Sequence, residues 1–213
     1  MVSLLARLGP VKLELWDPGI VDEPDLNRQL LYGWTDVGRR KTTAAVREVQ
    51  RVNPEVHVTG HPETLTRTSY NQERGPGPGT AGAGSAGSPG PAVLFDCVDS
   101  LASRRELDRI HRDRAMPVFH GAVQEWWGQA ATLLPGGGGY AAIYGRRWEP
   151  AEVEEPGGQP IMPHVVTTIA SAQVAEFVRW LESPEHTSLS AHLWYYDGKR
   201  LSGTRLQVGE TSG

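Results

Sequence analysis

Short apolar runs and helix-like repeats alternate along the first half of the chain. The runs at residues 11–17 (VKLELWD), 55–60 (EVHVTG) and 92–98 (AVLFDCV) predict strands, and the last run is typical of a strand buried on both faces of a sheet. Between them, Ala45 and Val49 recur at helical spacing, which predicts an amphipathic helix over residues 38–52. A short helix is also expected over residues 2–8.

The second half continues with helix, strand and hairpin signals. A helix is expected after residue 98, with Leu101 and Ile110 facing inward and Arg104 facing outward. Three further elements are predicted: strands at 116–123 and 126–135, and a long helix at 165–181. The Asp197-Gly198 dipeptide predicts a hairpin near the end. This order indicates an α/β domain with an antiparallel part appended at its C-terminal end.

Composition is consistent with one globular domain. The 213 residues are 38% hydrophobic and 22% charged, which suffices for a sizeable core. A net charge of −4 argues against nucleic-acid or anionic-membrane binding, and no apolar run approaches the roughly 18 residues of a membrane span. The first residues lack the order of a signal peptide, so a cytoplasmic protein is expected. Residues 71–92 are mostly Gly, Pro, Ala and Ser, which predicts a flexible surface loop.

Residue types that bind metals are sparse. Cys97 is the single cysteine, so neither an internal disulfide nor a cysteine-built zinc site is expected. Its place in an apolar strand predicts a buried and inert thiol. The histidines are scattered, and His120 is expected either to pack at a strand end or to line a cleft.

Charged and amide side chains gather in residues 25–41 (DLNRQLLYGWTDVGRRK), shortly after the strand that ends in Asp17. A second block begins with LFDCVDS at residue 94 and continues with HGAV and GQ. In this order, the motifs NRQ, DVGRRK, DCVDS and HGAV…GQ resemble the ThiF/MoeB/HesA adenylyltransferases, bacterial relatives of ubiquitin-activating enzymes. The resemblance covers roughly residues 3–135.

The resemblance implies a Rossmann-like, doubly wound and mostly parallel sheet with an antiparallel C-terminal extension. It also implies ATP-dependent adenylylation of the C-terminal carboxylate of a ubiquitin-like or sulfur-carrier protein. The carboxylate attacks the α-phosphate of ATP and pyrophosphate leaves, so catalysis consists of positioning and of neutralising phosphate charge. ATP, Mg²⁺ and a homodimer are implied, whereas zinc, nucleic acid and membranes are not expected.

The resemblance also implies roles for residues of this chain. Asp17 corresponds to the acid that binds the ribose hydroxyls, Arg28 and Lys41 to the cations that contact phosphate, and Asp99 to the magnesium ligand. The implied catalytic set is Arg28, Lys41 and Asp99. The implied nucleotide-binding set is Asp17, Asp25, Arg28, Gln29, Lys41 and Asp99. Without the resemblance, the two cations would be interpreted as solvated surface charges, and Asp17 and Asp99 as strand-end or helix-capping carboxylates.

Two departures from the family pattern bear on activity. The family begins with a strand and a GxGGxG turn that binds phosphate, whereas this chain, a single domain over residues 1–213, starts inside the helix expected after that turn. We therefore expect the first strand and the glycine loop to be lacking, with the coding region starting upstream of Met1 or a partner supplying the strand. Asp25 stands where the family usually has Asn, and a carboxylate beside the triphosphate would weaken binding.

Three functions remain open at this stage. The first is an adenylyltransferase whose activity is impaired in the chain as written. The second is a catalytically degenerate binding module that pairs with an active homologue or a carrier protein. The third, a nicotinamide- or flavin-dependent oxidoreductase, shares the fold type but does not explain Arg28, Lys41 and Asp99 together.

Overall fold

A computed structural model describes residues 1–9, 12–74, 92–148, 160–184 and 187–208 of the chain. Its elements follow in this order: α1 (Val2–Leu8), β1 (Lys12–Trp16), η1 (Glu23–Asn27), η2 (Trp34–Asp36), α2 (Lys41–Val52), β2 (His57–His61), α3 (Arg67–Arg74), β3 (Leu94–Asp96), α4 (Leu101–Arg114), β4 (Val118–Gln124), β5 (Trp127–Leu133), α5 (Gly139–Tyr144), η3 (Gly145–Trp148), α6 (Pro163–Glu182), β6 (His192–Asp197) and β7 (Ser202–Gln207).

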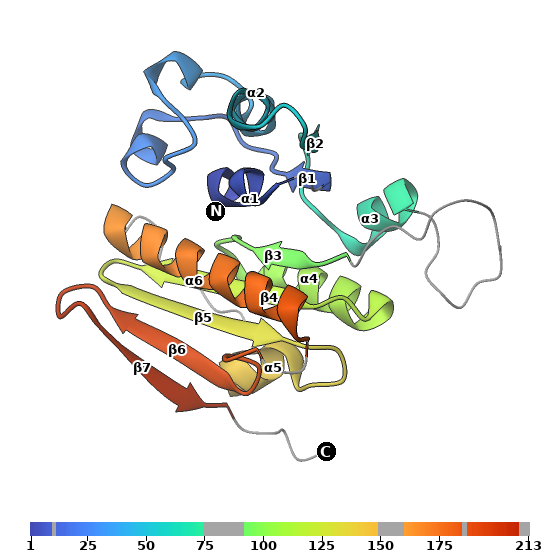
Figure 1. Cartoon of the computed structure of the whole chain (residues 1–213), viewed down its shortest axis with the longest axis vertical. Helices are drawn as coiled ribbons and strands as arrows, with labels where there is room; N and C mark the ends of the chain where they lie inside the picture. Colours follow the sequence, from blue (N-terminus) through green and yellow to red (C-terminus); the bar gives the residue numbers. More distant parts are fainter. Residues whose placement is uncertain (10–11, 75–91, 149–159, 185–186, 209–213) are drawn as a thin grey trace.

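The described strands form two separate sheets (Figure 1). In the smaller sheet, β1 and β2 run parallel, in a register that pairs Lys12 with His57 and Trp16 with His61. The helices α1 and α2 pack beside this pair through a cluster that includes Ala6 and Val49. This part of the fold holds the segment after β1 in which most of the candidate site residues lie.

The larger sheet has the strand order β3-β4-β5-β6-β7. β3 and β4 are parallel, and the remaining neighbours are antiparallel. Helix α6 covers one face, where Gly128 of β5 leaves room for Ile169; a Cβ at this glycine would overlap the isoleucine side chain. On the opposite face, Leu107 of α4 and Tyr140 of α5 belong to one core cluster with residues of β3, β4 and β5. The strand β3 therefore ends between two helical layers.

The predicted α/β class and the antiparallel C-terminal strands are confirmed, but the expected single, mostly parallel sheet is not observed. Among the described strands, two neighbouring pairs are parallel and three are antiparallel. Within the described residues, β1 pairs only with β2, and β3 pairs with β4 but not with β1. The two sheets meet through side chains instead, because Leu13 of β1 and Phe95 of β3 pack against the same hydrophobic cluster. The C-terminal hairpin forms as expected, with β6 and β7 joined through a turn that includes Gly198.

Several local predictions need correction. Arg104 was expected to face outward on α4, but it is buried with 6% exposure because its guanidinium pairs with the buried Asp96. Cys97 was expected inside a strand, but β3 ends at Asp96 and the cysteine is exposed. The predicted loop at residues 71–92 begins later, because residues 71–74 belong to α3; residues 75–91 lie outside the described residues.

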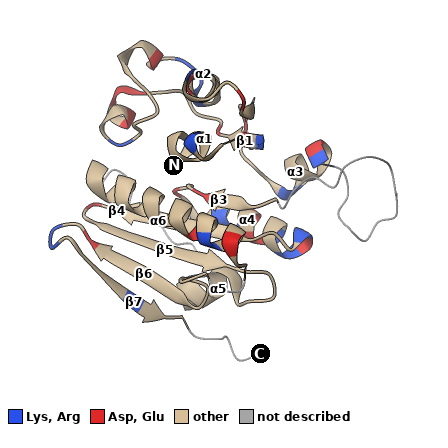
Figure 2. Cartoon of the chain, viewed as in Figure 1, with Lys and Arg blue, Asp and Glu red and all other residues tan. Residues whose placement is uncertain are grey.

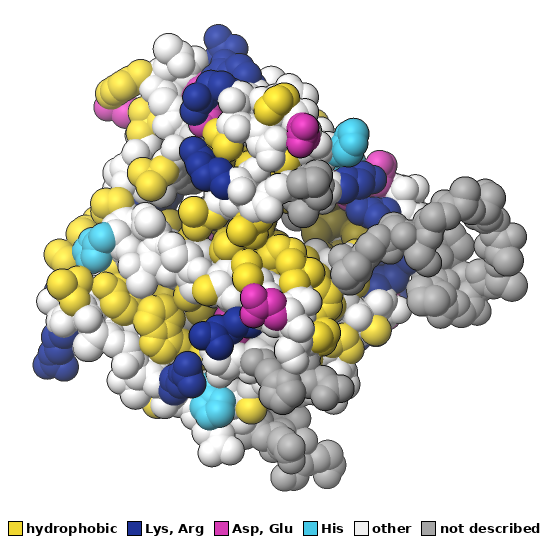
Figure 3. Space-filling model, in the orientation of Figure 1, with side chains coloured by type: hydrophobic (Ala, Val, Ile, Leu, Met, Phe, Trp, Pro, Cys, Tyr) yellow, Lys and Arg dark blue, Asp and Glu magenta, His cyan; other side chains and the backbone are white. Residues whose placement is uncertain are grey.

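Charged and apolar surfaces are unevenly distributed over the fold. The ribbon in Figure 2 marks acidic and basic residues along α4 and near α2, whereas the first half of α6, residues 163–175, carries no acidic residue, lysine or arginine. Figure 3 shows hydrophobic side chains reaching the surface across the middle of the same view. The exposed large apolar residues include Leu8 of α1 and Leu181 of α6. The charges are thus concentrated in the part of the chain that follows β1 and in α4.

Candidate functional site

The candidate site is centred on the segment that leaves the carboxyl end of β1. Asp17 directly follows β1, and its Oδ1 accepts a hydrogen bond of 2.7 Å from the N–H of Gly19. The carbonyl of Gly19 accepts a 3.0 Å hydrogen bond from the N–H of Lys41, the first residue of α2. A Cβ at Gly19 would lie 2.9 Å from Oδ1 of Asp17 and 3.4 Å from Cδ of Lys41. The side chains of Asp17 and Lys41 therefore both approach the place that a Cβ at Gly19 would occupy.

A buried carboxylate joins the remaining polar residues of this segment. Oδ2 of Asp25 lies 3.0 Å from Nζ of Lys41 and accepts a 3.1 Å hydrogen bond from the N–H of Asp22. Oδ1 accepts a 2.8 Å hydrogen bond from Nε2 of Gln29 and lies 3.3 Å from Nη2 of Arg28. Asp25, Arg28, Gln29 and Lys41 therefore form one connected group, which we call the Asp25 cluster.

Tyr32 belongs to the same neighbourhood, although the sequence provided no reason to select it. Burial raises the pKa of its hydroxyl, and the negative charges of Asp17, Asp25 and Asp36 raise it further. Asp36 is itself buried and paired with Arg47. At neutral pH, Tyr32 is thus protonated, and the negative charges of three carboxylates act on it. A tyrosine in an apolar run such as LLYGW carries no signal for this position, because the nearby charges come from separate turns.

Asp99 is not bonded to the Asp25 cluster in the part of the chain that the structure describes. It is exposed in the loop between β3 and α4, and within the described residues no hydrogen bond or ion pair joins it to Asp17, Asp25 or Lys41. The alternative role as a helix cap is not observed, because Oγ of Ser100 caps α4 by accepting a hydrogen bond from the N–H of Ser103. The carboxylate of Asp99 is therefore left accessible at the carboxyl end of a parallel strand.

An exposed carboxylate of this kind suits Mg²⁺, which takes few protein oxygens and completes its coordination with water and phosphate. The described residues contain no group of three or more metal-binding side chains, so a fully protein-made cage is not formed there. Asp99 thus fits a metal that arrives together with a phosphate ligand. The basic side chains of Arg28 and Lys41 fit the phosphates themselves.

A second polar group is buried where β3 ends, and sequence reasoning found only one of its members. Oδ2 of Asp96 accepts hydrogen bonds from Nδ1 of His120 at 2.6 Å, from the hydroxyl of Tyr140 at 2.8 Å and from Nε of Arg104 at 3.2 Å. Oδ1 accepts a 3.1 Å hydrogen bond from the N–H of Val98. Asp96 and His120 are fully buried, so of the two roles predicted for His120, packing rather than lining a cleft is observed.

Burial acts to raise the pKa of Asp96, but the hydrogen bonds from His120 and Tyr140 and the positive charge of Arg104 outweigh it and hold the pKa below its ordinary value. The same guanidinium also donates to the carbonyl of Val98. Both ends of the turn at residues 97–98 are thereby held, immediately before Asp99. No local pattern predicts this arrangement, because its members come from β3, β4, α4 and α5.

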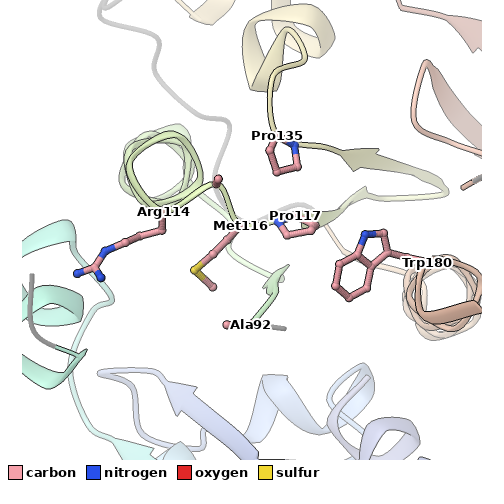
Figure 4. Close-up of a pocket in the computed structure, with 7 residues that line it drawn as sticks. Ala92, Arg114, Met116, Pro117, Pro135 and Trp180 are labelled. Atoms are coloured by element: carbon pink, nitrogen blue, oxygen red, sulfur yellow. The ribbon is translucent and has the colours of Figure 1, made fainter. Parts of the chain in front are cut away.

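A pocket of about 320 Å³ lies at the other end of β3. Its lining includes Ala92, which precedes β3, and Met116 and Pro117, which precede β4 (Figure 4). Trp180, near the end of α6, also lines it. Arg114 extends away from the other labelled residues in this view, and its guanidinium bonds to the side chain of Asn71. This apolar pocket is therefore separate from the carboxyl ends of β1 and β3, where Asp17 and Asp99 lie.

The chain belongs to the ThiF family, whose profile matches residues 1–212. It is 26% identical to the SAMP-activating enzyme E1 of Haloferax volcanii over 201 residues, which cover 94% of this chain and 69% of that protein. It is 24% identical to the sulfur carrier protein ThiS adenylyltransferase of Escherichia coli over 211 residues, which cover 98% of this chain and 77% of that protein.

Solved structures share the fold. Escherichia coli MccB, in a crystal with AMPCPP and MccA, superposes with a TM-score of 0.76 at 14% identity, over 99% of this chain and 60% of the MccB chain. PaaA superposes with a TM-score of 0.70 at 19% identity, over 97% of this chain and 59% of that chain. This chain therefore spans less than two thirds of the length of these solved chains. Within the described residues, no helix has both the length and the apolar character needed to cross a membrane.

Proposed function

We propose that the chain carries out ATP-dependent adenylylation of the C-terminal carboxylate of a ubiquitin-like or sulfur-carrier protein. A carboxylate oxygen attacks the α-phosphorus of ATP, an oxygen–phosphorus bond forms, and the bond to the departing pyrophosphate breaks. The observation that carries the proposal is the convergence of Asp17, Arg28 and Lys41 on the carboxyl end of β1. Nucleotides bind at the carboxyl ends of strands in folds of this class.

Each residue has a distinct part in the proposal. Lys41 and Arg28 bind phosphate oxygens and neutralise the charge that develops on the departing pyrophosphate. Asp17 accepts hydrogen bonds from the ribose hydroxyls, and Gln29 holds the anion-binding group in place through Asp25. Bound Mg²⁺, with Asp99 as its protein ligand, would supply charge neutralisation between phosphate oxygens. The family's curated members support the substrate class: one is named for activating SAMP and one for adenylylating the sulfur carrier ThiS.

Nucleotide binding is the first test. We expect the purified chain to bind ATP in the presence of Mg²⁺, and we expect Lys41→Ala to weaken binding at least tenfold, because the residue at the centre of the anion site loses its charge. Lys12→Ala is the matched control, since Lys12 lies at the opposite end of β1 and its side chain is 58% exposed beside Glu14. Isothermal titration calorimetry measures both. Equal ATP affinity in the wild type and Lys41→Ala would exclude this site.

Catalysis is tested by exchange of labelled pyrophosphate into ATP, with the Escherichia coli sulfur carrier ThiS as the carboxylate donor. A second candidate function is a degenerate binding module that holds a carrier protein without activating it. The pairing of Asp25 with both proposed phosphate cations favours this alternative. A chain that binds the carrier but shows no ATP binding and no exchange would be such a module; exchange that Lys41→Ala abolishes would refute it.

A further inference from the structure

We propose that Asp25 is an internal counter-ion that competes with ligand phosphate for Lys41 and Arg28, and so sets how much anionic charge the site accepts. This inference rests on the proposed function, because it assigns a specificity role within the same site. It goes further because Asp25 is paired with both proposed phosphate cations, so that competition for them, and not repulsion alone, sets the affinity for polyphosphates.

Geometry favours competition over a purely structural role. Both oxygens of Asp25 are engaged, one with Lys41 at 3.0 Å and the other with Arg28 at 3.3 Å. The Asp25 side chain is only 9% exposed, whereas those of Lys41 and Arg28 are 15% and 30% exposed. The accessible part of each ion pair is thus the cation. A phosphate that approaches from solvent meets cations whose inner side is already occupied by a carboxylate.

The backbone holds the carboxylate in place. The carbonyl of Asp25 accepts hydrogen bonds from the N–H groups of Arg28 and Gln29, and its side chain accepts one from the N–H of Asp22. Asp25 therefore stays where it is when a ligand binds, and the flexible side chains of Lys41 and Arg28 must adapt. Within the Asp25 cluster, two cations and one fixed carboxylate leave one net positive charge. Each additional negative charge on the ligand then meets repulsion from Asp25.

Asparagine would remove this charge and keep one of the two oxygen acceptors of the side chain. Its carbonyl oxygen can accept from the N–H of Asp22 or from Gln29, as Asp25 does. We therefore expect Asp25→Asn to bind pyrophosphate and ATP about 10–100-fold more tightly than the wild type, through the removal of one nearby like charge. The gain should shrink as ionic strength rises, since salt screens a charge effect of this kind.

The test compares three proteins by calorimetry with two probes, inorganic pyrophosphate and ATP with Mg²⁺. Asp22→Asn is the matched control, because Asp22 is an exposed acid three positions away whose side chain contacts neither cation; its affinities should stay within about twofold of the wild type. Asp25→Ser, which keeps an oxygen acceptor, replaces Asp25→Asn if that variant does not fold, as judged by circular dichroism.

Failure of the inference and failure of the proposed function give different results. If the folded Asp25 variant binds pyrophosphate no more tightly than the wild type, the counter-ion role is overturned, and Lys41-dependent ATP binding by the wild type would leave the proposed function standing. If the variant gains pyrophosphate affinity but neither protein binds ATP, the counter-ion role holds and the proposed nucleotide function fails. A gain for both probes supports both.

Discussion

Replacing Asp96 by Asn tests the most deeply buried charge in the fold. Asp96 has no exposed surface, and its partner Arg104 has a side-chain exposure of 8% at a distance of 3.2 Å. Asparagine leaves the guanidinium buried without a counter-charge and turns a carboxylate that accepts from His120 and Tyr140 into a weaker, mismatched acceptor. Breaking one side of a buried ion pair costs about 3–5 kcal/mol, a large share of a typical stability of about 5–15 kcal/mol.

Urea unfolding followed by circular dichroism measures this loss at pH 7. Asp113→Asn is the control on α4, the helix that carries Arg104, because the Asp113–Arg67 pair is exposed and such pairs contribute less than about 1 kcal/mol. The double variant Asp96→Asn with Arg104→Met should lose less than the two single changes added together, since no buried charge is then left alone. A loss below about 1 kcal/mol for Asp96→Asn would refute the assignment of Asp96 as a buried anion that stabilises the fold.

The same variant has a defined pH dependence. The pKa of Asp96 lies below that of an unfolded aspartate, which is about 3.9. A lowered pKa contributes stability that is present above the unfolded value and is lost as the pH falls through the folded value. The difference in unfolding free energy between the wild type and Asp96→Asn should therefore stay constant from about pH 7 to 5 and narrow below about pH 4. A difference that is unchanged at the lowest pH where both proteins fold would contradict this assignment.

Two further predictions concern the layers around the larger sheet. Burial and the neighbouring Asp96 raise the pKa of Tyr140 well above its ordinary value, so absorbance titration of the folded protein should be the same for the wild type and Tyr140→Phe up to about pH 10. Stability that depends on protonated Tyr140 is present below about pH 10 and is lost as the pH rises further; a phenolate signal missing from Tyr140→Phe near pH 10 would disprove the shift. Gly128→Ala should lower the free energy of unfolding in urea by about 1–3 kcal/mol, because the new Cβ overlaps Ile169. An unchanged urea midpoint would show that α6 moves away from the new methyl group without loss of stability.

Much of the local structure followed from the order of residues alone. The helices at 2–8 and 163–182 and the amphipathic helix ending at Val52 formed close to the predicted positions, because apolar periodicity is a property of neighbouring residues. The amphipathic helix α2 begins at Lys41 rather than at the predicted Gly38, because residues 38–40 instead form hydrogen bonds to the segment after β1. The motif spacing likewise pointed to Asp17 and Lys41, which the structure brings to the same glycine.

Local sequence patterns did not predict which residues are buried or which distant segments pair. A helix wheel assigns Arg104 to solvent, because the carboxylate that accounts for its burial comes from β3. The predicted strand continued past Asp96 and therefore placed Cys97 in the core. In the structure the strand ends one residue before Cys97, and Cys97 is exposed. The roles assigned to Asp17, Arg28, Gln29, Lys41 and Asp99 remain predictions.

The amino-acid sequence by itself determined the family and most of the helical and strand segments, and it selected the segment after β1 as a candidate phosphate site, since each depends on residue types at short spacing. Only the tertiary structure decided that the strands divide into two sheets, that Asp96 gathers donors from separate elements, and that Asp25 already neutralises part of the charge of Lys41 and Arg28. The physical reason is that hydrogen bonds and ion pairs act over about 3 Å in space, and which residues come within that distance depends on the packing of whole elements rather than on their separation along the chain.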